Sequence, residues 1–242
     1  MNNKTVVISG ASGGIGIAIS KAFYNEGYNI VLLYNKNKKA LEDEFSLTDK
    51  RVLMLKGDLS KERDVLKIKE KVYSSFNSVD IIVNNAGISL VKFFDETTCE
   101  EWDNVFDVNV KSAFMLTKAF LPEMINKKRG NIINISSMWG ISGASMEVCY
   151  SASKAALIGM SKALAKEVGP SGINVNVIAP GVIDTKMNNH LSKEDMESLI
   201  EETPINRIGT PEDVANAVLF LCDKKASFIT GEVISVDGGF IL

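Results

Sequence analysis

Two patterns of apolar and polar residues alternate along the chain. Short continuous runs of aliphatic and β-branched residues recur, and between them apolar residues return every three or four positions. Continuous runs of this length are typical of strands buried on both faces, whereas the longer spacing is typical of amphipathic helices. The runs predict strands at residues 4–9, 29–34, 51–56, 79–83, 130–135, 173–178 and 232–236.

Helices are predicted between these strands, at residues 17–26, 60–76, 98–125 and 150–168 and from residue 210 onward. Ser60 is the predicted N-cap of the second helix, and Thr98 with Glu101 has the spacing of a capping box. Thr210 and Pro211 suit the start of the last helix. Strands alternating with helices predict a Rossmann-type doubly wound sheet of about seven parallel strands, with helices on both faces, in a single domain spanning residues 1–242.

Two segments break the helical periodicity. Residues 138–149 are predicted to be a loop, and the apolar side chains in it either form a substrate wall or pack beneath the loop. Residues 182–207 are more polar and are the candidate for a mobile lid over a ligand site. His190, the single histidine, lies in the second segment, where a histidine is more often solvated than catalytic.

Composition narrows the class of protein. A formal net charge of -3 argues against a nucleic-acid binder that relies on a broad basic face. Cys99, Cys149 and Cys222 are odd in number and widely spaced, so we expect reduced thiols and no metal site or disulfide frame. No apolar run approaches the roughly 18 residues of a membrane span. The sequence therefore predicts a cytoplasmic protein without nucleic-acid or membrane partners.

A glycine-rich turn follows the first strand directly. Gly10, Gly14 and Gly16 stand between that strand and a helix, which is the setting of a dinucleotide-binding turn. Glycines let the backbone approach a pyrophosphate, whose charge then lies at the helix N-terminus. The alternative is that the glycines only allow tight packing.

The second strand ends in lysines where NAD-binding proteins carry an acid. Tyr34, Asn35 and Lys36 open this stretch, and a carboxylate is absent from it. Because lysines attract a 2′-phosphate and an acid would repel one, NADP(H) is favoured over NAD(H). The alternative is an ordinary solvated helix start. Asp58, after the third strand, either reaches an adenine amino group or caps a local turn.

Tyr150 and Lys154 lie four residues apart and therefore share one face of a helix. An ammonium beside a phenol favours the phenolate, so we expect the pKa of Tyr150 to be lowered toward working pH, where a tyrosine can give or take a proton at an alcohol or carbonyl oxygen. Such a pair also arises by chance on solvated helices. Ser137, at a strand end, and Asn109, inside an apolar helix face, strengthen the functional interpretation, although satisfied core asparagines exist.

In order and spacing these residues resemble the short-chain dehydrogenase/reductase family, and within it the bacterial 3-oxoacyl-[acyl-carrier-protein] reductases. The resemblance covers essentially the whole chain and is carried by segments 107–109, 129–137 and 172–180. It implies that Tyr150 is the general acid and that Lys154 lowers its pKa and binds the nicotinamide ribose. Ser137 would orient the substrate oxygen, and Asn109 would hold a water in a proton relay.

The resemblance also implies a set of residues that line the cofactor and no metal site. The cofactor set comprises Gly10, Ser12, Gly14, Ile15, Gly16, Tyr34, Asn35, Lys36, Asp58, Leu59, Asn85, Ala86, Gly87, Tyr150, Lys154, Pro180, Gly181, Ile183 and Thr185.

The chain departs from the reductase pattern at a few positions. Gly13 replaces an arginine of many NADP-preferring members, and Ser171 replaces an arginine linked to carrier-protein docking. Glu147 replaces a frequent glutamine and would oppose the effect of Lys154 on Tyr150.

The resulting function is NADPH-dependent reduction of a 3-oxoacyl thioester in fatty acid synthesis, with acyl carrier protein as a possible partner and a homotetrameric assembly. The alternatives are an NAD(P)-dependent dehydrogenase of a sugar, polyol or other secondary alcohol and, more remotely, a non-catalytic NAD(P)-binding sensor or scaffold.

Overall fold

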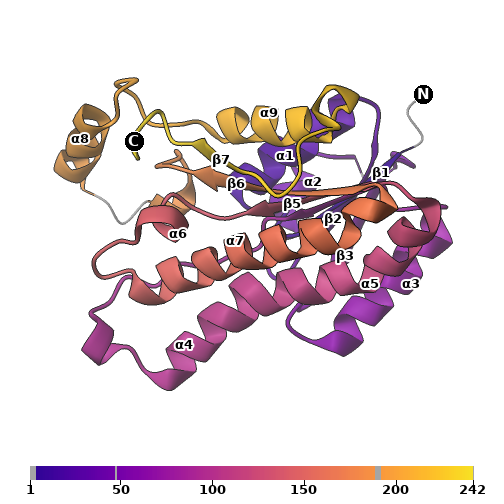
Figure 1. Ribbon diagram of the computed structural model, residues 1–242, viewed down its shortest axis with the longest axis horizontal. Helices are drawn as coiled ribbons and strands as arrows, with labels where there is room; N and C mark the ends of the chain where they lie inside the picture. The colour runs from indigo at the N-terminus through magenta and orange to yellow at the C-terminus, as the bar shows by residue number, and fades with distance from the viewer. Residues whose placement is uncertain (1–3, 47, 189–191, 242) are drawn as a thin grey trace.

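A seven-stranded parallel sheet forms the centre of the protein (Figure 1), in the order β3-β2-β1-β4-β5-β6-β7. The structure is a computed structural model, which describes residues 4–46, 48–188 and 192–241. The strands are β1 (Thr5–Ile8), β2 (Asn29–Tyr34), β3 (Val52–Lys56), β4 (Ile81–Asn84), β5 (Gly130–Ile135), β6 (Ile173–Pro180) and β7 (Val233–Val236). The doubly wound parallel sheet predicted from the apolar runs is confirmed.

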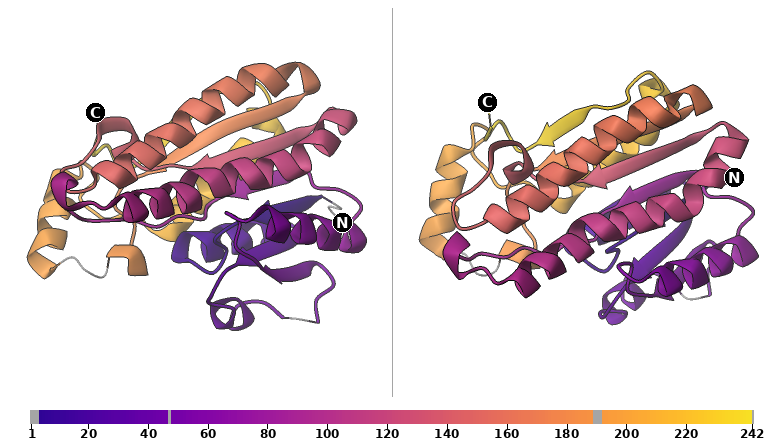
Figure 2. Two further views of the ribbon diagram at one scale, coloured as in Figure 1. Left: turned by 90° about the horizontal axis from the view of Figure 1, so that it is seen from below. Right: turned by 60° about the horizontal axis from the view of Figure 1, so that its bottom comes forward.

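Helices cover both faces of this sheet (Figures 1 and 2). Helices α1 and α9 pack on one face, and α3, α5 and α7 pack on the other. The helices are α1 (Gly14–Asn25), α2 (Lys39–Glu42), α3 (Glu62–Ser75), α4 (Cys99–Phe106), α5 (Ser112–Lys127), α6 (Trp139–Ser142), α7 (Val148–Val168), α8 (Lys193–Glu202) and α9 (Pro211–Cys222). Short 3-10 turns occur at Phe94–Glu96, Gly169–Ser171, Lys186–Asn188 and Lys224–Ala226, and a π-helical turn occurs at Asp107–Lys111.

The strands are largely apolar because each face of the sheet meets a helical layer, and polar residues within them, such as Asn84, Asn134 and Asn176, are buried. Side chains along a strand alternate between the two faces, so Val6 and Ile8 join the core under α1 and α9 while Val7 joins the core under α3 and α5. This arrangement explains the apolar runs, since both faces of the sheet are covered.

Local capping chemistry sets several helix ends as predicted. Thr98 and Thr210 both form complete capping boxes at the starts of α4 and α9. The prediction of Ser60 as an N-cap is wrong, because α3 begins after Lys61 and the Ser60 hydroxyl donates to Asp58 Oδ1 at 2.7 Å. The acceptor of that hydrogen bond lies two residues before Ser60, so the serine closes the preceding turn instead of starting the helix.

Two further predictions about local structure are corrected. Residues 138–149 contain the short helix α6 and are therefore not all loop. The helix predicted over residues 98–125 is interrupted by the π-helical turn Asp107–Lys111. Such single turns inside α-helices are frequent at functional sites.

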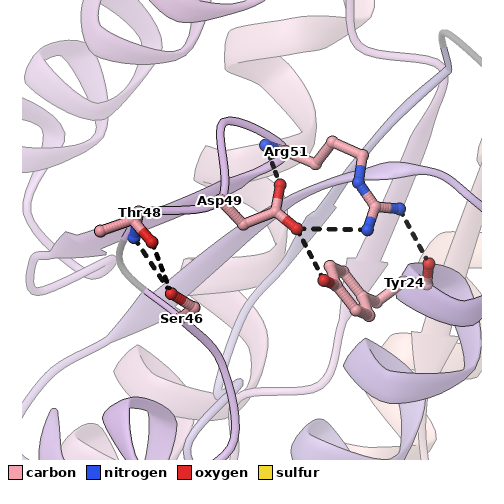
Figure 3. Close-up of polar contacts among 5 residues, drawn as sticks. All are labelled: Tyr24, Ser46, Thr48, Asp49 and Arg51. Atoms are coloured by element: carbon pink, nitrogen blue, oxygen red, sulfur yellow. Dashed lines mark hydrogen bonds and ion pairs between the residues drawn. The ribbon is translucent and has the colours of Figure 1, made fainter.

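The segment between β2 and β3 is tied to helix α1 by one polar cluster (Figure 3). The Tyr24 hydroxyl donates to Asp49 Oδ2 at 2.6 Å, and the Arg51 guanidinium donates to the same carboxylate and to the Tyr24 carbonyl oxygen. Ser46 and Thr48 close a turn beside this cluster. The contact fixes the amino end of β3, the opposite end of the sheet from the predicted site.

Parallel strands place their carboxyl ends at one edge of the sheet, where the predicted site residues follow β1, β2, β4, β5 and β6. Within the described residues, no helix is long and apolar enough to cross a membrane.

Candidate active site

The glycine turn after β1 is shaped by close backbone packing. A Cβ atom on Gly10 would lie 2.8 Å from Ala86 Cα, and one on Gly16 would overlap the Gly10 carbonyl oxygen. Gly10 also has a left-handed φ of 60°. The packing alternative is therefore true of these two glycines, whereas a Cβ on Gly13 would meet nothing closer than 3.5 Å.

The N-terminus of α1 also fits an anion, in addition to the packing role of the glycines. The helix begins at Gly14, no side chain caps its first turn, and that turn contains no acidic residue. The helices α4, α8 and α9 contrast with it, because each of their first turns is closed by a capping box with acidic residues. Ser12, Ile15 and the free first-turn N–H groups of α1 thus surround a position suited to a pyrophosphate.

The end of β4 is bonded to this turn through Ser9, which the sequence analysis missed. The Ser9 hydroxyl oxygen accepts hydrogen bonds from the backbone N–H groups of Asn85 and Ala86, at 2.9 and 3.0 Å. The Asn85 amide donates to the carbonyl oxygens of Ser9 and Gly10, both at 3.1 Å. Ser9 is a polar residue directly after an apolar strand, and this position in the sequence could have indicated its role.

Asn84 ties neighbouring elements together beneath the site. Its amide nitrogen donates to Asn134 Oδ1 on β5 at 2.7 Å and to Thr117 Oγ1 on α5 at 3.0 Å. Asn134 in turn donates to Ser161 on α7. This buried chain holds β4, β5 and α7 in a fixed relation.

Lysines after β2 fall into two groups. Lys38 and Lys39 form ion pairs with Glu42 and Asp43, one helical turn later, so these two fit the alternative of a solvated helix start. Lys36 is exposed, and no ion pair or hydrogen bond ties its side chain to another described residue. Tyr34 and Asn35 lead to it from the carboxyl end of β2.

Asp58 and Leu59 follow β3. The Asp58 carboxylate accepts hydrogen bonds from the backbone and hydroxyl of Ser60, so the local-turn interpretation applies to one of its oxygens. Leu59 is buried in the core beside α3, which leaves its backbone as the part that could line a cofactor.

Tyr150 and Lys154 lie in the first turns of α7 and are both buried, with 8% and 4% of their surface exposed. The Lys154 ammonium donates to the Ile135 carbonyl oxygen at 2.9 Å and lies 5.6 Å from the centre of the Tyr150 ring. Ser137, just after β5, is hydrogen-bonded to the Tyr150 hydroxyl. The helix and the strand end thus bring the predicted tyrosine, lysine and serine together.

Burial dominates the electrostatics of this group. It raises the pKa of Tyr150 to about 12, a rise that the Ser137 hydrogen bond opposes and the Glu147 carboxylate adds to. Burial also lowers the pKa of Lys154 to about 8. The prediction that Lys154 holds the pKa of Tyr150 below its ordinary value is therefore wrong for these side chains as they stand. The predicted opposing effect of Glu147 is confirmed.

Asn109 is fully buried at the centre of the π-helical turn. Its carbonyl oxygen accepts from the Ile88 N–H at 2.8 Å, and its amide donates to the Ile88 carbonyl oxygen and to Ser153 Oγ, both at 2.9 Å. A Cβ on Gly87 would lie 3.4 Å from Asn109 Oδ1 and 3.1 Å from Lys154 Nζ. Asn109 and Lys154 therefore border Gly87 together, and the water relay stays a prediction.

The segment after β6 reaches back over the glycine turn. A Cβ on Gly14 would lie 2.9 Å from Thr185 Cγ2, which puts Thr185 at the N-terminus of α1. Pro180 accepts a hydrogen bond from Met138, Gly181 packs against Asp237, and Ile183 is buried. The predicted cofactor residues of this segment thus lie beside those of the first strand. His190 lies outside the described residues.

Apolar side chains occur in the segment that follows β5. Met146 and Val148 are exposed, whereas Trp139 is half buried. Met146 has a left-handed φ of 61°, and its carbonyl oxygen accepts from the Lys92 N–H at 2.7 Å. The contact joins the segments after β4 and β5 into one rim.

The residues of this site can be tested for whether they would hold a dinucleotide cofactor or a metal ion. A dinucleotide fits the uncapped N-terminus of α1, the glycine backbone and the exposed Lys36, which lie along the carboxyl edge of the sheet. No cluster of three or more histidine, cysteine or acidic residues suited to a metal occurs within the described ranges. Cys99, Cys149 and Cys222 are free thiols.

Comparison with known proteins agrees with this geometry. A family model described as enoyl-(acyl carrier protein) reductase matches residues 10–241. The chain is 41% identical to the uncharacterized oxidoreductase YmfI of Bacillus subtilis, over 98% of this chain and 99% of that protein. It is 40% identical to the 3-oxoacyl-[acyl-carrier-protein] reductase FabG of Chlamydia muridarum, over 98% of this chain and 97% of that protein.

Solved structures extend the similarity. A short-chain dehydrogenase/reductase from Brucella melitensis, described as a glucose/ribitol dehydrogenase, superposes with a TM-score of 0.93 at 33% identity, covering 99% of this chain and 97% of that one. The structure of ElxO with NADP bound gives a TM-score of 0.90 at 32% identity, covering 98% of each chain. The chain therefore belongs to the short-chain dehydrogenase/reductase family, whose members are NAD(P)-dependent oxidoreductases.

Proposed function

We propose that this protein reduces the 3-oxo group of an acyl thioester with NADPH. The observation that carries the proposal is the buried group of Ser137, Tyr150 and Lys154 at the carboxyl edge of the sheet, next to the uncapped N-terminus of α1. Several relatives of similar length are 3-oxoacyl-[acyl-carrier-protein] reductases, which supports the same substrate class.

The roles of the side chains follow from their protonation. Because the pKa of Tyr150 is raised to about 12, the phenol is neutral at physiological pH and can donate its proton to the carbonyl oxygen of the substrate. The Ser137 hydroxyl donates a second hydrogen bond to the same oxygen and orients it. A bound nicotinamide supplies the hydride to the carbonyl carbon.

Lys154 supports this step from behind the tyrosine. Its ammonium, 2.9 Å from the Ile135 carbonyl oxygen, is held within the buried site and can hydrogen-bond a ribose hydroxyl. Asn109 borders the same space beside Gly87 and is the candidate to hold a water through which a replacement proton reaches Lys154 and then Tyr150.

Replacing Tyr150 tests the chemistry directly. Tyr150→Phe keeps the ring but removes the transferable proton, so we expect turnover to fall by about 10²-fold or more while cofactor binding remains. Turnover equal to that of the wild type would contradict this mechanism. Loss of turnover with retained binding would also set aside the alternative of a non-catalytic sensor.

The substrate is tested by following oxidation of reduced nicotinamide with an acetoacetyl thioester, using NADPH and NADH in parallel. Oxidation of NADPH in preference to NADH supports the proposal. Oxidation of neither cofactor would favour the second candidate, a sugar or polyol dehydrogenase, which the similarity to the Brucella melitensis protein supports. A panel of sugars and polyols then identifies that activity.

NADPH preference is assigned to Lys36, the lysine without an ion pair in this stretch. Lys36→Ala should raise the KM for NADPH several-fold and leave the KM for NADH unchanged, because NADH lacks the 2′-phosphate. Lys38→Ala is the matched control, since Lys38 is paired with Glu42. Equal effects of the two changes would contradict the assignment.

Two partner proposals complete this function. Acyl carrier protein is the proposed carrier of the thioester, which competition between carrier-linked and coenzyme-A-linked substrates would check. A homotetramer is the proposed assembly, which sedimentation analysis would check.

A further inference from the structure

The segment Asp237–Ile241, called here the tail, is folded by its own hydrogen bonds. The Asp237 carboxylate accepts from the backbone N–H groups of Gly239 and Ile241, at 3.0 and 3.1 Å, and its carbonyl oxygen accepts from the Phe240 N–H. Gly238 and Gly239 both adopt left-handed φ angles, of 67° and 84°. The tail is therefore a built turn with a defined path.

One side of the tail contacts residues 203–205, near the end of residues 182–207, the segment that the sequence predicts to be a lid (called here the lid segment). A Cβ on Gly238 would lie 2.6 Å from Thr203 Cγ2, and one on Gly239 would lie 3.2 Å from Pro204 Cγ. The Ile205 N–H donates to the Gly238 carbonyl oxygen at 3.3 Å. In Figure 1 the yellow C-terminal segment accordingly lies between α8 and α6.

The other side of the tail contacts helix α6. The rings of Phe240 and Trp139 meet edge to face, with centroids 5.8 Å apart. The Trp139 backbone N–H donates to Ser137 Oγ at 3.1 Å. That bond occupies a lone pair of the serine oxygen and so leaves its hydrogen to point elsewhere, toward Tyr150 or a substrate oxygen.

Helix α6 has little freedom on its other side. A Cβ on Gly140 would lie 2.7 Å from Ser136 Oγ and 2.9 Å from Lys154 Cβ, so the turn is already pressed against α7. The Phe240 ring contacts the same turn through the side chain of Trp139. The turn that carries the Trp139 N–H is thus in contact with α7 and with the tail.

We propose that Phe240 is a positioning residue, which holds Trp139 so that its N–H orients the Ser137 hydroxyl toward the reacting oxygen. The tail thereby links the end of the lid segment to the reactive serine. This inference rests on the proposed reductase function for its kinetic consequence, but its structural consequence stands apart from the substrate.

The structural consequence is measured by hydrogen exchange of the peptide that contains residues 137–143. Phe240→Ala should accelerate exchange of this peptide, because the Trp139 N–H loses its fixed acceptor geometry, and Phe240→Leu should accelerate it less, because it keeps part of the apolar contact. Phe228→Ala is the matched control, because that ring is fully exposed, at 102%. Unchanged exchange in Phe240→Ala would overturn the inference.

The kinetic consequence is measured with the acetoacetyl thioester. Phe240→Ala should lower kcat between about tenfold and a hundredfold, as small misplacements of catalytic groups do, while the Kd of NADPH changes less than about twofold. In a Ser137→Ala background the same change should have almost no further effect on kcat, since Phe240 acts through that serine.

The outcomes separate the two proposals. If the wild type oxidises NADPH with the thioester but the effects of Phe240→Ala and Ser137→Ala on kcat multiply, the positioning role is refuted and the reductase function stands. If the wild type shows no thioester activity, the reductase function fails, and the exchange measurement still decides whether Phe240 positions Trp139. If Phe240→Ala does not fold, Phe240→Leu carries the same comparison with a smaller cavity.

Discussion

Lys154 carries a positive charge into the interior, and the free energy of unfolding should report that charge as pH changes. The side chain is 4% exposed, and burial lowers its pKa from 10.5 to about 8. Below about pH 8 the lysine is charged in both the folded and the unfolded protein. Between about pH 8 and 10.5 the folded protein has lost this proton while the unfolded chain retains it, so stability rises with pH.

The size of the effect follows from the shift in pKa. Each pKa unit corresponds to about 1.4 kcal/mol, so the contribution of Lys154 to the free energy of unfolding should rise by about 2–3 kcal/mol from pH 7 to pH 10. Other groups also titrate in this range. A difference between the wild type and Lys154→Met removes their contributions, because they are common to both proteins.

The assay is urea unfolding of the two proteins at intervals between pH 7 and pH 10. We expect the wild type to gain stability relative to Lys154→Met by about 2–3 kcal/mol over this range. Loss of the hydrogen bond to Ile135 also changes the stability of Lys154→Met, by an amount that does not depend on pH over most of the range. Lys162→Met, an exposed lysine two turns further along α7, is the control. Parallel profiles for the wild type and Lys154→Met would refute the buried-charge reasoning.

Three further predictions concern other parts of the site. Gly16→Ala should lower the free energy of unfolding by about 1–3 kcal/mol and remove most of the cofactor affinity, because its Cβ would overlap the Gly10 carbonyl oxygen. Gly13→Ala is the control, because a Cβ has room there, and it should change neither quantity in urea unfolding and cofactor titration. Glu147→Gln should lower the pKa of Tyr150 and therefore raise the rate of alcohol oxidation at a fixed alkaline pH; a lower rate would contradict this. Asp213→Asn should destabilise α9 by about 1 kcal/mol at pH 7. The difference in stability from the wild type should shrink toward pH 2, where the Asp213 carboxyl takes up its proton. A difference in stability that stays constant with pH would exclude the charge as the cause.

Local sequence determined much of the fold. Each strand is a continuous apolar run that needs cover on both faces, and the capping boxes at Thr98 and Thr210 depend on residues three positions apart. The same is true of Tyr150 and Lys154, whose spacing alone puts them on one helix face. These features were predictable because their physical causes lie within one or two turns of the chain.

Tertiary structure decided the electrostatics and the details of the site. The sequence predicts that Lys154 lowers the pKa of Tyr150, but burial raises that pKa instead, since desolvation depends on everything packed around a group. Two further features likewise depend on partners that sequence spacing does not specify. One is which lysine after β2 stays unpaired, and the other is that Ser9 joins β1 to β4.

The contact between Phe240 and Trp139 is the clearest case of this limit. These residues are about a hundred positions apart in the sequence, and neither local pattern indicates the other. They meet because β5, β6 and β7 are adjacent in the sheet, so that the segments following β5 and β7 leave it at the same edge. The sequence by itself determined the elements and the chemistry that they carry, whereas the packing of the sheet decided which side chains orient one another.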